Sequence, residues 1–260
     1  MIHSSDARVS LAVGLLVLIN GSIMEIPAQQ PKHYAAGRTP DGDPDLRGIW
    51  EIHETVNWNV EGHVASKGVS ASKTVVVDPP DGKIPYQPSA LAKRASMNLA
   101  DDPQNKCFLD GVPRITYSPG PFQIFQTDGQ VIIIYQNQHA YRFIPTAMKQ
   151  TDSADFWLGS SMGKWDGDTL TVDSISFNDQ TWFDKAGNFH SDNLHVVERY
   201  TLIGANSLQY EARIEDPKVF TKAWKIRMLA KRHTEPGFRI IEDECLKDSK
   251  GVLFHTTLGK

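Results

Sequence analysis

The chain contains 260 residues, of which 40% are hydrophobic and 22% are charged, as in an ordinary globular protein. Its 27 Lys and Arg residues against 31 Asp and Glu residues give a formal net charge of -4, so no overall positive field would attract nucleic acid. The sequence has no glycine repeat and no block of like charges, which excludes a fibrous chain and a long disordered one.

The N-terminal segment has the pattern of a secretory signal peptide. Arg8 precedes an apolar run at 11–19, which is shorter than the roughly 20 apolar residues of a membrane span. Cleavage after Ala28 would leave a mature chain that begins at Gln29. We therefore expect residues 1–28 to be a signal peptide and the mature protein to be periplasmic or secreted, without a membrane span. An uncleaved N-terminal anchor is the alternative.

Cys107 and Cys245 are the only cysteines of the chain. In an oxidising compartment an even pair most simply forms a disulfide, and closing so long a loop would stabilise the fold by about 4–5 kcal/mol on the chain-entropy model. A buried free thiol and a nucleophile assisted by a histidine are the other interpretations. Neither cysteine lies in a recognisable nucleophile motif, so we predict the disulfide.

The part of the mature chain before Cys107 is expected to be mostly irregular. A first strand includes Gly48-Ile49-Trp50, and repeated prolines between 59 and 106 forbid a long regular element apart from a short helix at 90–99. A segment of this kind usually wraps a scaffold or covers a cavity mouth. We divide the mature chain into an N-terminal segment at 29–106, with the first strand and a Pro/Gly-rich wrapping loop, and a main barrel at 107–260 that forms a single domain with 41–58.

Beyond Cys107 the pattern changes to short apolar runs separated by tight turns. Asp128-Gly129, Asp166-Gly167 and the stretch 204–207 each separate two such runs, which is the signal of a β-hairpin. No helical segment alternates with these runs, so the strands are predicted to be antiparallel. The expected strands are 122–127, 131–135, 139–144, 163–165, 169–173, 195–203, 208–214, 223–231 and 238–245, the last two joined by Glu235-Pro236-Gly237.

Strands that follow one another as hairpins leave two open sheet edges, and closing the sheet into a barrel pairs those edges. We therefore predict a mostly β fold, an antiparallel lipocalin/calycin-like β-barrel with a long Pro-rich N-terminal excursion. A barrel of roughly eight to ten strands encloses either a packed core or one small-ligand cavity. Gly48-Ile49-Trp50 also resembles the Gly-x-Trp of lipocalin-like barrels. A two-sheet sandwich is the main structural alternative.

Four longer motifs stand out along the chain: Pro-Asp-Gly-x-Pro-Asp-Leu-x-Gly-Ile-Trp at 40–50, Gly-x-Trp-x-Gly-Asp-Thr-Leu-x-Val-Asp at 163–173, Phe-Asn-Asp-x-Thr-Trp at 177–182 and His-Ser-x-x-Leu-His-x-x-Glu-Arg at 190–199. Together they resemble a family of secreted, largely uncharacterised bacterial proteins, and the segments 107–114 and 121–124 also look like its members. The resemblance covers nearly the whole mature chain. It implies a periplasmic or secreted protein and supplies no agreed reaction or catalytic residues.

The densest group of polar side chains lies between 173 and 199. A strand that opens at His195 would turn His195 and Arg199 to one face and Glu198 to the other. If the first face lines a cavity, His195 would exchange a proton while Arg199 stabilises an enolate or carboxylate, with Asp173, Asp179 or Glu211 as the balancing charge. The structural alternative is an Arg–carboxylate pair that closes the barrel end, with His195 as a satisfied, half-buried residue.

We accordingly expect catalytic residues in His195, His190, Arg199 and Asp179, and no cofactor. A divalent metal at His190 and His195 is an alternative, although their spacing matches no established metal motif. Ser161 sits in a Gly-x-Ser-x-Gly sequence, but that motif needs a strand-to-helix turn that is not predicted here. The residues expected to bind a substrate are Trp182, Tyr135, His139, Asn178, Arg114 and Trp165.

The leading functional hypothesis is a cofactor-independent enzyme of the lyase, isomerase or hydrolase type. It would act by His and carboxylate acid–base chemistry on a small, partly apolar molecule in the barrel cavity. The alternative is a periplasmic binding or carrier protein that uses the same cavity without turnover. Convergence of His and carboxylate groups on the cavity would indicate the enzyme, whereas an almost wholly apolar cavity would indicate the carrier.

Overall fold

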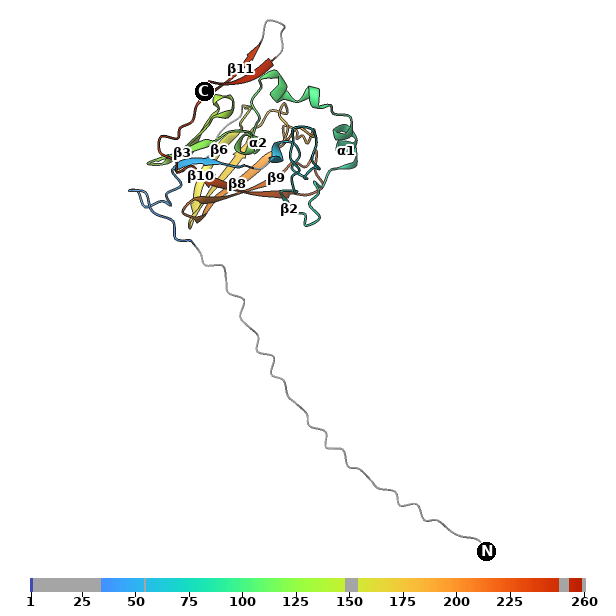
Figure 1. Cartoon of the computed structure of the whole chain (residues 1–260), viewed down its shortest axis with the longest axis horizontal. Coiled ribbons are helices and arrows are strands. Elements are labelled where there is room, and N and C mark those ends of the chain that lie inside the picture. The colour runs from blue at the N-terminus through green and yellow to red at the C-terminus, as the bar shows by residue number, and fades with distance from the viewer. Residues whose placement is uncertain (2–33, 54, 148–153, 248–252, 259–260) are drawn as a thin grey trace. The chain divides into compact units, whose positions relative to one another are not determined.

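The structure is a computed structural model that describes residue 1 and residues 34–53, 55–147, 154–247 and 253–258. The signal peptide expected at 1–28 therefore lies outside the described residues, apart from Met1. Among the described residues, no helix is long and apolar enough to cross a membrane. The elements, shown in Figure 1, are β1 (Gly48–Glu51), η1 (Thr55–Asn57), β2 (Val76–Asp78), α1 (Pro88–Ala95), η2 (Leu99–Asp101), η3 (Pro103–Lys106), α2 (Arg114–Tyr117), β3 (Phe122–Thr127), β4 (Gln130–Tyr135), η4 (Asn137–His139), β5 (Tyr141–Pro145), β6 (Ser160–Asp166), β7 (Thr169–Ile175), β8 (His195–Gly204), β9 (Ser207–Glu215), β10 (Trp224–Arg232), β11 (Glu242–Lys247) and β12 (Leu253–Leu258).

Alternating apolar residues and tight turns produce one antiparallel sheet. Its strand order is β5-β4-β3-β1-β10-β9-β8-β7-β6, and β2 pairs additionally with β10. The predicted hairpins β3–β4, β6–β7 and β8–β9 are confirmed, and Gly129 and Gly167 take the positive φ angles that the first two turns require. Strand β1 lies between β3 and β10, so the N-terminal strand belongs to the same sheet as the later strands.

The two edge strands of this sheet, β5 and β6, face each other, so the nine strands form a nearly closed barrel. A Cβ atom on Gly163 of β6 would lie 3.0 Å from the Ile144 side chain of β5 and 2.9 Å from that of Thr146. These edges approach so closely that a larger side chain than glycine would have to displace a neighbour. The predicted fold class, a mostly antiparallel lipocalin-like barrel with few helices, is confirmed.

The C-terminal strands correct one expectation. The run 238–245 is not the hairpin partner of β10: the strand there is β11, which pairs with β12 in a separate two-stranded sheet. Strand β10 already pairs with β9 on one side and with β1 and β2 on the other, so it has no edge left to accept β11. The predicted disulfide is confirmed, and Cys107 and Cys245 have their Cα atoms 5.8 Å apart.

The inward-facing side chains fill the barrel, and the centre of this core is polar. Glu198 of β8 is fully buried and accepts two hydrogen bonds from Arg142 of β5, at 2.6 and 3.1 Å. The hydroxyl groups of Tyr200 and Tyr210 each donate to the same carboxylate at 2.9 Å. The buried carboxylate therefore accepts four hydrogen bonds, and Arg142 also balances its charge. The apolar residues around this cluster include Trp50, Phe122, Ile124, Ile133, Val172, Val196, Ala212, Ile226 and Met228.

The Arg142 guanidinium is as deeply buried as its partner. Burial alone would lower its pKa, but the Glu198 carboxylate outweighs that effect, so the pKa of Arg142 lies above its ordinary value. The guanidinium also donates to the hydroxyl groups of Ser161 at 2.9 Å and Ser174 at 3.2 Å. Ser161 thus faces inward from an edge strand, in agreement with the expectation that it is not a nucleophile on a strand-to-helix turn.

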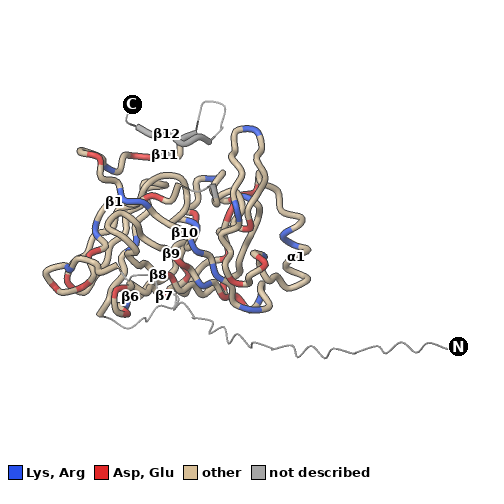
Figure 2. Tube along the Cα trace, turned by 60° about the horizontal axis from the view of Figure 1, so that its bottom comes forward, with Lys and Arg blue, Asp and Glu red and all other residues tan. Residues whose placement is uncertain are grey.

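One end of the barrel is covered by two chain segments, 55–121 and 176–194, which we call the cap. Helix α1 and the loops around it lie beyond the strands at the right of Figure 1. The cap rests on a cluster of aromatic rings. The ring centroid of Phe183 lies 5.5 Å from that of Trp224 and 6.2 Å from that of Phe220. The Tyr117 hydroxyl of α2 donates to the Phe183 carbonyl at 2.8 Å, which joins the two segments. Residues of both charge signs are spread over the described part of the chain (Figure 2).

Replacing Glu198 with Ala should lower the free energy of unfolding by about 3–5 kcal/mol, because Arg142 would keep a buried charge without its carboxylate. Arg199→Ala, one position along on the opposite face, is the matched control. Its ion pair with Asp166 is exposed and 3.3 Å long, so its loss should cost less than about 1 kcal/mol. Urea unfolding followed by tryptophan fluorescence measures both values, and equal costs at the two positions would contradict this assignment of faces.

Candidate functional site

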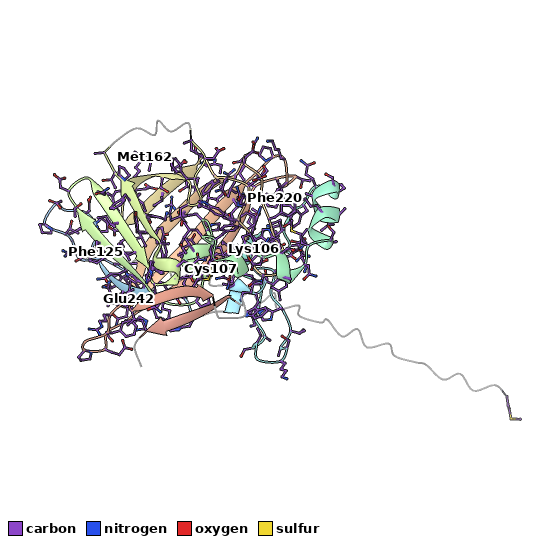
Figure 3. The ribbon with its side chains drawn as sticks, turned by 90° about the horizontal axis from the view of Figure 1, so that it is seen from above. Lys106, Cys107, Phe125, Met162, Phe220 and Glu242 are labelled. Carbon is purple, nitrogen blue, oxygen red and sulfur yellow. A yellow bond between two sulfur atoms is a disulfide. The ribbon has the colours of Figure 1, made fainter. Side chains whose placement is uncertain are left out.

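The cap contains an open pocket of about 210 Å³ near Cys107. One wall comes from η3 and the residues that follow it, and the other comes from the loop after β7. Figure 3 shows Lys106 and Cys107 side by side at the first wall. The residues that line the pocket are Pro103, Lys106, Phe108, Asp179, Gln180 and Trp182.

The first wall is fixed at both ends of η3. Asp102 caps the start of this short helix, where its carboxylate accepts a hydrogen bond from the Gln104 amide at 3.1 Å. The two carboxylate oxygens also accept one hydrogen bond each from Arg114, both 2.8 Å long. At the other end Cys107 has a φ of 60° and is bonded to Cys245. The wall therefore has little freedom to move.

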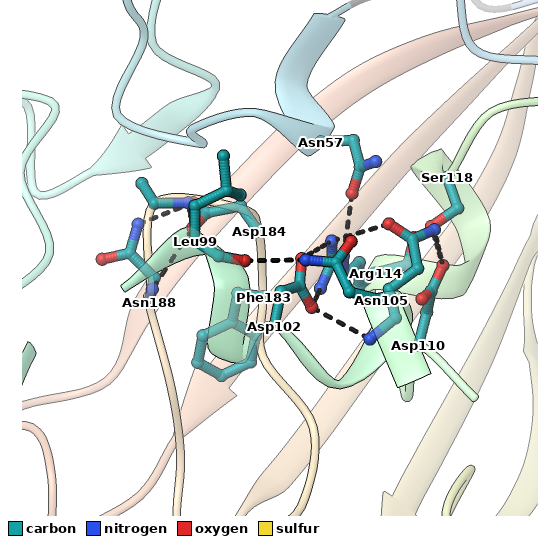
Figure 4. Close-up of polar contacts among 12 residues, drawn as sticks. Asn57, Leu99, Asp102, Asn105, Asp110, Arg114, Ser118, Phe183, Asp184 and Asn188 are labelled. Carbon is teal, nitrogen blue, oxygen red and sulfur yellow. Dashed lines mark hydrogen bonds and ion pairs between the residues drawn. The ribbon is translucent and has the colours of Figure 1, made fainter. Parts of the chain in front are cut away.

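Arg114 is the centre of a second buried polar network, drawn in Figure 4. Besides Asp102 it binds the side-chain oxygen of Asn57 at 2.8 Å, so it connects three parts of the cap. Burial opposes the charge of Arg114, but Asp110 and Asp102 outweigh that effect and raise its pKa. Burial also raises the pKa of Asp110, which accepts hydrogen bonds from the side chains of Ser118, Gln104 and Asn137. Arg114 is thus part of the frame behind the pocket.

The second wall follows from local turns after β7. The Asn178 side chain accepts a hydrogen bond from the Gln180 amide at 3.1 Å, which turns Asp179 and Gln180 outward. Thr181 points inward instead and lies against Gly111, where an added Cβ atom would collide with the Thr181 hydroxyl. Gly111 also has a φ of 73°, which glycine adopts readily. This position therefore requires glycine both for space and for its backbone conformation.

His190 is buried behind this wall, and both of its ring nitrogens have partners. Nδ1 is 2.9 Å from the Ser191 carbonyl, which can only accept, so Nδ1 carries the proton. Nε2 then accepts from the Thr181 hydroxyl at 2.6 Å. Burial lowers the pKa of His190, which favours this neutral form. The geometry is that of a structural histidine that holds Thr181 in place.

His195 and Arg199 lie on the outer face of β8, whereas Val196, Glu198 and Tyr200 point into the barrel. The alternation along this strand is as predicted, but the face that bears His195 does not line a barrel cavity. His195 pairs through Nε2 with Asp173 at 3.0 Å, and Arg199 pairs with Asp166 rather than with any of the three expected carboxylates. The two residues therefore do not converge with His190.

The remaining predicted residues divide between the pocket and other places. Asp179 and Trp182 line the pocket, and Asn178 shapes its wall. Tyr135 lies inside the barrel, where its hydroxyl accepts a 3.4 Å hydrogen bond from Arg142. His139 accepts a hydrogen bond from the Asp243 amide at 3.1 Å and so contacts β11. Trp165 of β6 packs against the hydrophobic core.

Four pocket residues were not expected from the sequence: Pro103, Lys106, Phe108 and Gln180. Three of them flank Cys107, and Gln180 lies within the motif 177–182 that also contains Asp179 and Trp182. The one feature of the sequence that could have indicated these residues is the pair of a charged and an aromatic side chain on either side of Cys107. Nothing in the sequence indicates that the segments 103–108 and 179–182 meet.

Asp184 holds the loop 181–190 to the rest of the cap. Its carboxylate accepts hydrogen bonds from the Val60 amide at 2.9 Å and from the Asn188 side chain at 2.6 Å. Complete burial raises the pKa of Asp184 from 3.8 to about 6, against the opposing effect of these hydrogen bonds. The cap therefore contains a carboxyl group that keeps its proton to a higher pH when the chain is folded.

Because folding raises the pKa of Asp184, the wild type should lose stability relative to Asp184→Asn as the pH rises from the unfolded value of 3.8 to about 6. The shift corresponds to about 3 kcal/mol. We expect the variant's free energy of unfolding, minus that of the wild type, to grow by about 2–3 kcal/mol over this window and to stay constant above it. Urea unfolding at half-unit pH intervals tests this, and a difference that does not change with pH would contradict it.

Comparisons with protein-family models, curated proteins and solved structures gave no match to this chain. The resemblance to secreted bacterial proteins therefore stays a prediction that rests on the four sequence motifs. In the fold, the motif at 40–50 leads into β1, that at 163–173 forms the β6–β7 hairpin, that at 177–182 forms a pocket wall, and that at 190–199 opens β8.

Proposed function

We propose that this protein binds a small molecule with an apolar part and a charged group in the cap pocket. The observation that carries the proposal is the composition of the pocket. Phe108 and Trp182 supply aromatic surface, while Lys106 and Asp179 supply opposite charges. Within the described part of the chain, neither charged group forms an ion pair. Sites for small molecules combine apolar walls with a few charged or polar groups in this way.

The size of the pocket limits the ligand. Its volume of about 210 Å³ is below the roughly 300–1,000 Å³ of sites for drug-sized molecules, which favours a compact metabolite. The barrel interior is a less suitable place for a ligand, because Arg142, Glu198 and the tyrosines around them fill its centre and satisfy one another. Binding at the cap, not inside the barrel, distinguishes this proposal from a lipocalin-like carrier.

We further propose that the protein works outside the cytoplasm, in the periplasm or as a secreted protein. Two observations support this location: the signal-peptide pattern at 1–28 and the Cys107–Cys245 disulfide. Disulfides persist in oxidising compartments and are rare in the cytoplasm. Here the bond ties β11 to the first pocket wall, so it also contributes to the geometry of the proposed binding site.

The acid–base enzyme is the second candidate, and one observation favours it. Asp179, one of its four expected catalytic residues, lines the same pocket as Lys106, so a carboxylate and an amine border the same ligand space. Neither His190 nor His195 is among the pocket residues. Proton transfer by Asp179 would be the chemistry available there, and it would make the protein a lyase, isomerase or hydrolase that needs no cofactor.

The binding proposal predicts a ligand that depends on the pocket residues. A library of small aromatic acids and amines is screened by thermal shift, and calorimetry then gives the Kd of each hit. Asp179→Asn, Lys106→Gln and Phe108→Ala, all at exposed positions, should weaken binding about tenfold or more, since each removes roughly 1.4 kcal/mol or more of ligand contact.

The exposed ion pair of Lys218 and Asp192 lies outside the pocket, so Asp192→Asn is the matched control and should leave the Kd unchanged. Hits that bind all four variants as well as the wild type would show that the pocket is not the site. Product formation from a hit, lost in Asp179→Asn, would establish the enzyme instead of the binding protein.

A further inference from the structure

A group of side chains of the types that can bind a metal lies outside the cap, at and just beyond the end of β1 and just beyond the end of β10. Glu51, His53 and His233 each offer a donor atom, and the three atoms all lie within 4.8 Å of one another. Among the described residues this is the one such group with three donors. It shares no residue with the cap pocket, so any role of these three side chains is independent of the proposed function.

The strand geometry brings these residues together on the outer surface of the barrel. Trp50 points into the core, so Glu51 faces outward, and His53, two residues further on, returns to the same side. Strands β1 and β10 are antiparallel, with Glu51 opposite Lys231. The His233 amide donates to the Ile49 carbonyl at 2.9 Å, which continues the ladder and puts His233 diagonally across from Glu51.

The distances between the donor atoms suit one metal ion. Oε2 of Glu51 is 2.8 Å from Nε2 of His233, and Oε1 of the same carboxylate is 3.7 Å from Nδ1 of His53. With metal–ligand bonds of about 2.0–2.2 Å, two neighbouring ligands are about 3.0 Å apart in an octahedral site and about 3.4 Å apart in a tetrahedral one. The separations of 2.8 and 3.7 Å, measured from the two different oxygens of Glu51, lie within a few tenths of an ångström of these values. Lys231, which lies opposite Glu51 in the ladder, donates to the Ser207 hydroxyl at 3.1 Å.

The surroundings of His233 resemble the outer shell of a metal site. A histidine that binds a metal usually donates its other ring N–H to a carboxylate or carbonyl, which fixes the ring and makes it a better ligand. Nδ1 of His233 is 3.3 Å from a carboxylate oxygen of Glu235. The ring also stacks on Phe238, with 3.6 Å between centroids and 4° between planes. Phe238 and Glu235 thus hold the ring with Nε2 directed at Glu51.

We propose that Glu51, His53 and His233 bind one divalent transition metal ion of the zinc class. Two imidazole nitrogens and one carboxylate suit Zn²⁺, Co²⁺, Ni²⁺ or Fe²⁺, whereas Mg²⁺ and Ca²⁺ prefer all-oxygen sites. His53 is 60% exposed while His233 is 12% exposed, so the ion would be held from the protein side and remain open to water or a further ligand. Three protein ligands with an open position are typical of zinc sites that can bind or activate another molecule.

The test is metal binding by the untagged mature protein after treatment with a chelator. Calorimetry with ZnCl₂ should give one saturable site, and CoCl₂ should produce the visible absorption bands of a coordinated Co²⁺ ion, while MgCl₂ and CaCl₂ should give neither. His53→Ala, at an exposed position where folding is not at risk, and Glu51→Gln should each weaken Zn²⁺ binding about tenfold or more, because the loss of an outer-shell partner alone typically costs about 10–100-fold in metal affinity.

His195→Ala is the matched control, because His195 also pairs with one carboxylate on the outer barrel face but lies outside the three-donor group. It should bind Zn²⁺ as the wild type does. The absence of saturable Zn²⁺ binding, or equal affinities in His53→Ala, Glu51→Gln and the wild type, would overturn the proposal. Binding lost in His195→Ala but kept in His53→Ala would place the metal at the other pair and overturn it too.

Discussion

The Glu198 carboxylate lies inside the barrel among packed side chains, and its charge must be balanced by the protein. Arg142 reaches it from β5, while Tyr200 and Tyr210 donate from β8 and β9. These strands come from opposite parts of the sheet order, so the ion pair connects one edge of the sheet with the middle of the other half. Since β5 and β6 meet through side chains, this contact across the interior helps to keep the barrel closed. We infer that this ion pair selects one arrangement of the strands more than it adds net stability.

The cap depends on the barrel through a second buried cation. Arg114 binds Asp102 and Asn57 in the cap, and Thr116 in the same short helix α2 contacts the Tyr135 hydroxyl at 3.5 Å. Tyr135 in turn accepts a hydrogen bond from Arg142. The two polar networks are thus joined through α2, and the walls of the pocket rest on the filled interior. We infer that the barrel acts as a scaffold, and that recognition of other molecules takes place on its cap and outer surface.

Much of the fold could be predicted because its signals are local. Asp128-Gly129 and Asp166-Gly167 mark turns, and apolar residues alternate along the strands on either side. The alternation also separated His195 from Glu198 correctly. It did not say which face is inside, because the partner that makes a buried Glu198 acceptable is Arg142, 56 residues away. A charged residue in a strand is expected to face water unless such a partner is known.

The meeting of the two pocket walls and the outer histidine group escaped prediction for the same reason. Segments 103–108 and 179–182 are far apart in the chain and are brought together by the cap, not by a strand ladder. Glu51 and His53 do form a recognisable alternate pair, but His233 joins them from 182 residues beyond Glu51. The successive-hairpin expectation for 238–245 was wrong because β1 had already taken the edge of β10 that the later strand would need.

The central claim is that a ligand binds at the cap while the barrel interior stays closed. The indole N–H signals of ¹⁵N-labelled protein test this most directly, because Trp182 lines the pocket whereas Trp50 and Trp224 are fully buried in the core. On saturation with a ligand found by screening, the Trp182 signal should move and those of Trp50 and Trp224 should stay in place. Movement of the Trp50 and Trp224 signals with an unchanged Trp182 signal would put the ligand inside the barrel and contradict the account.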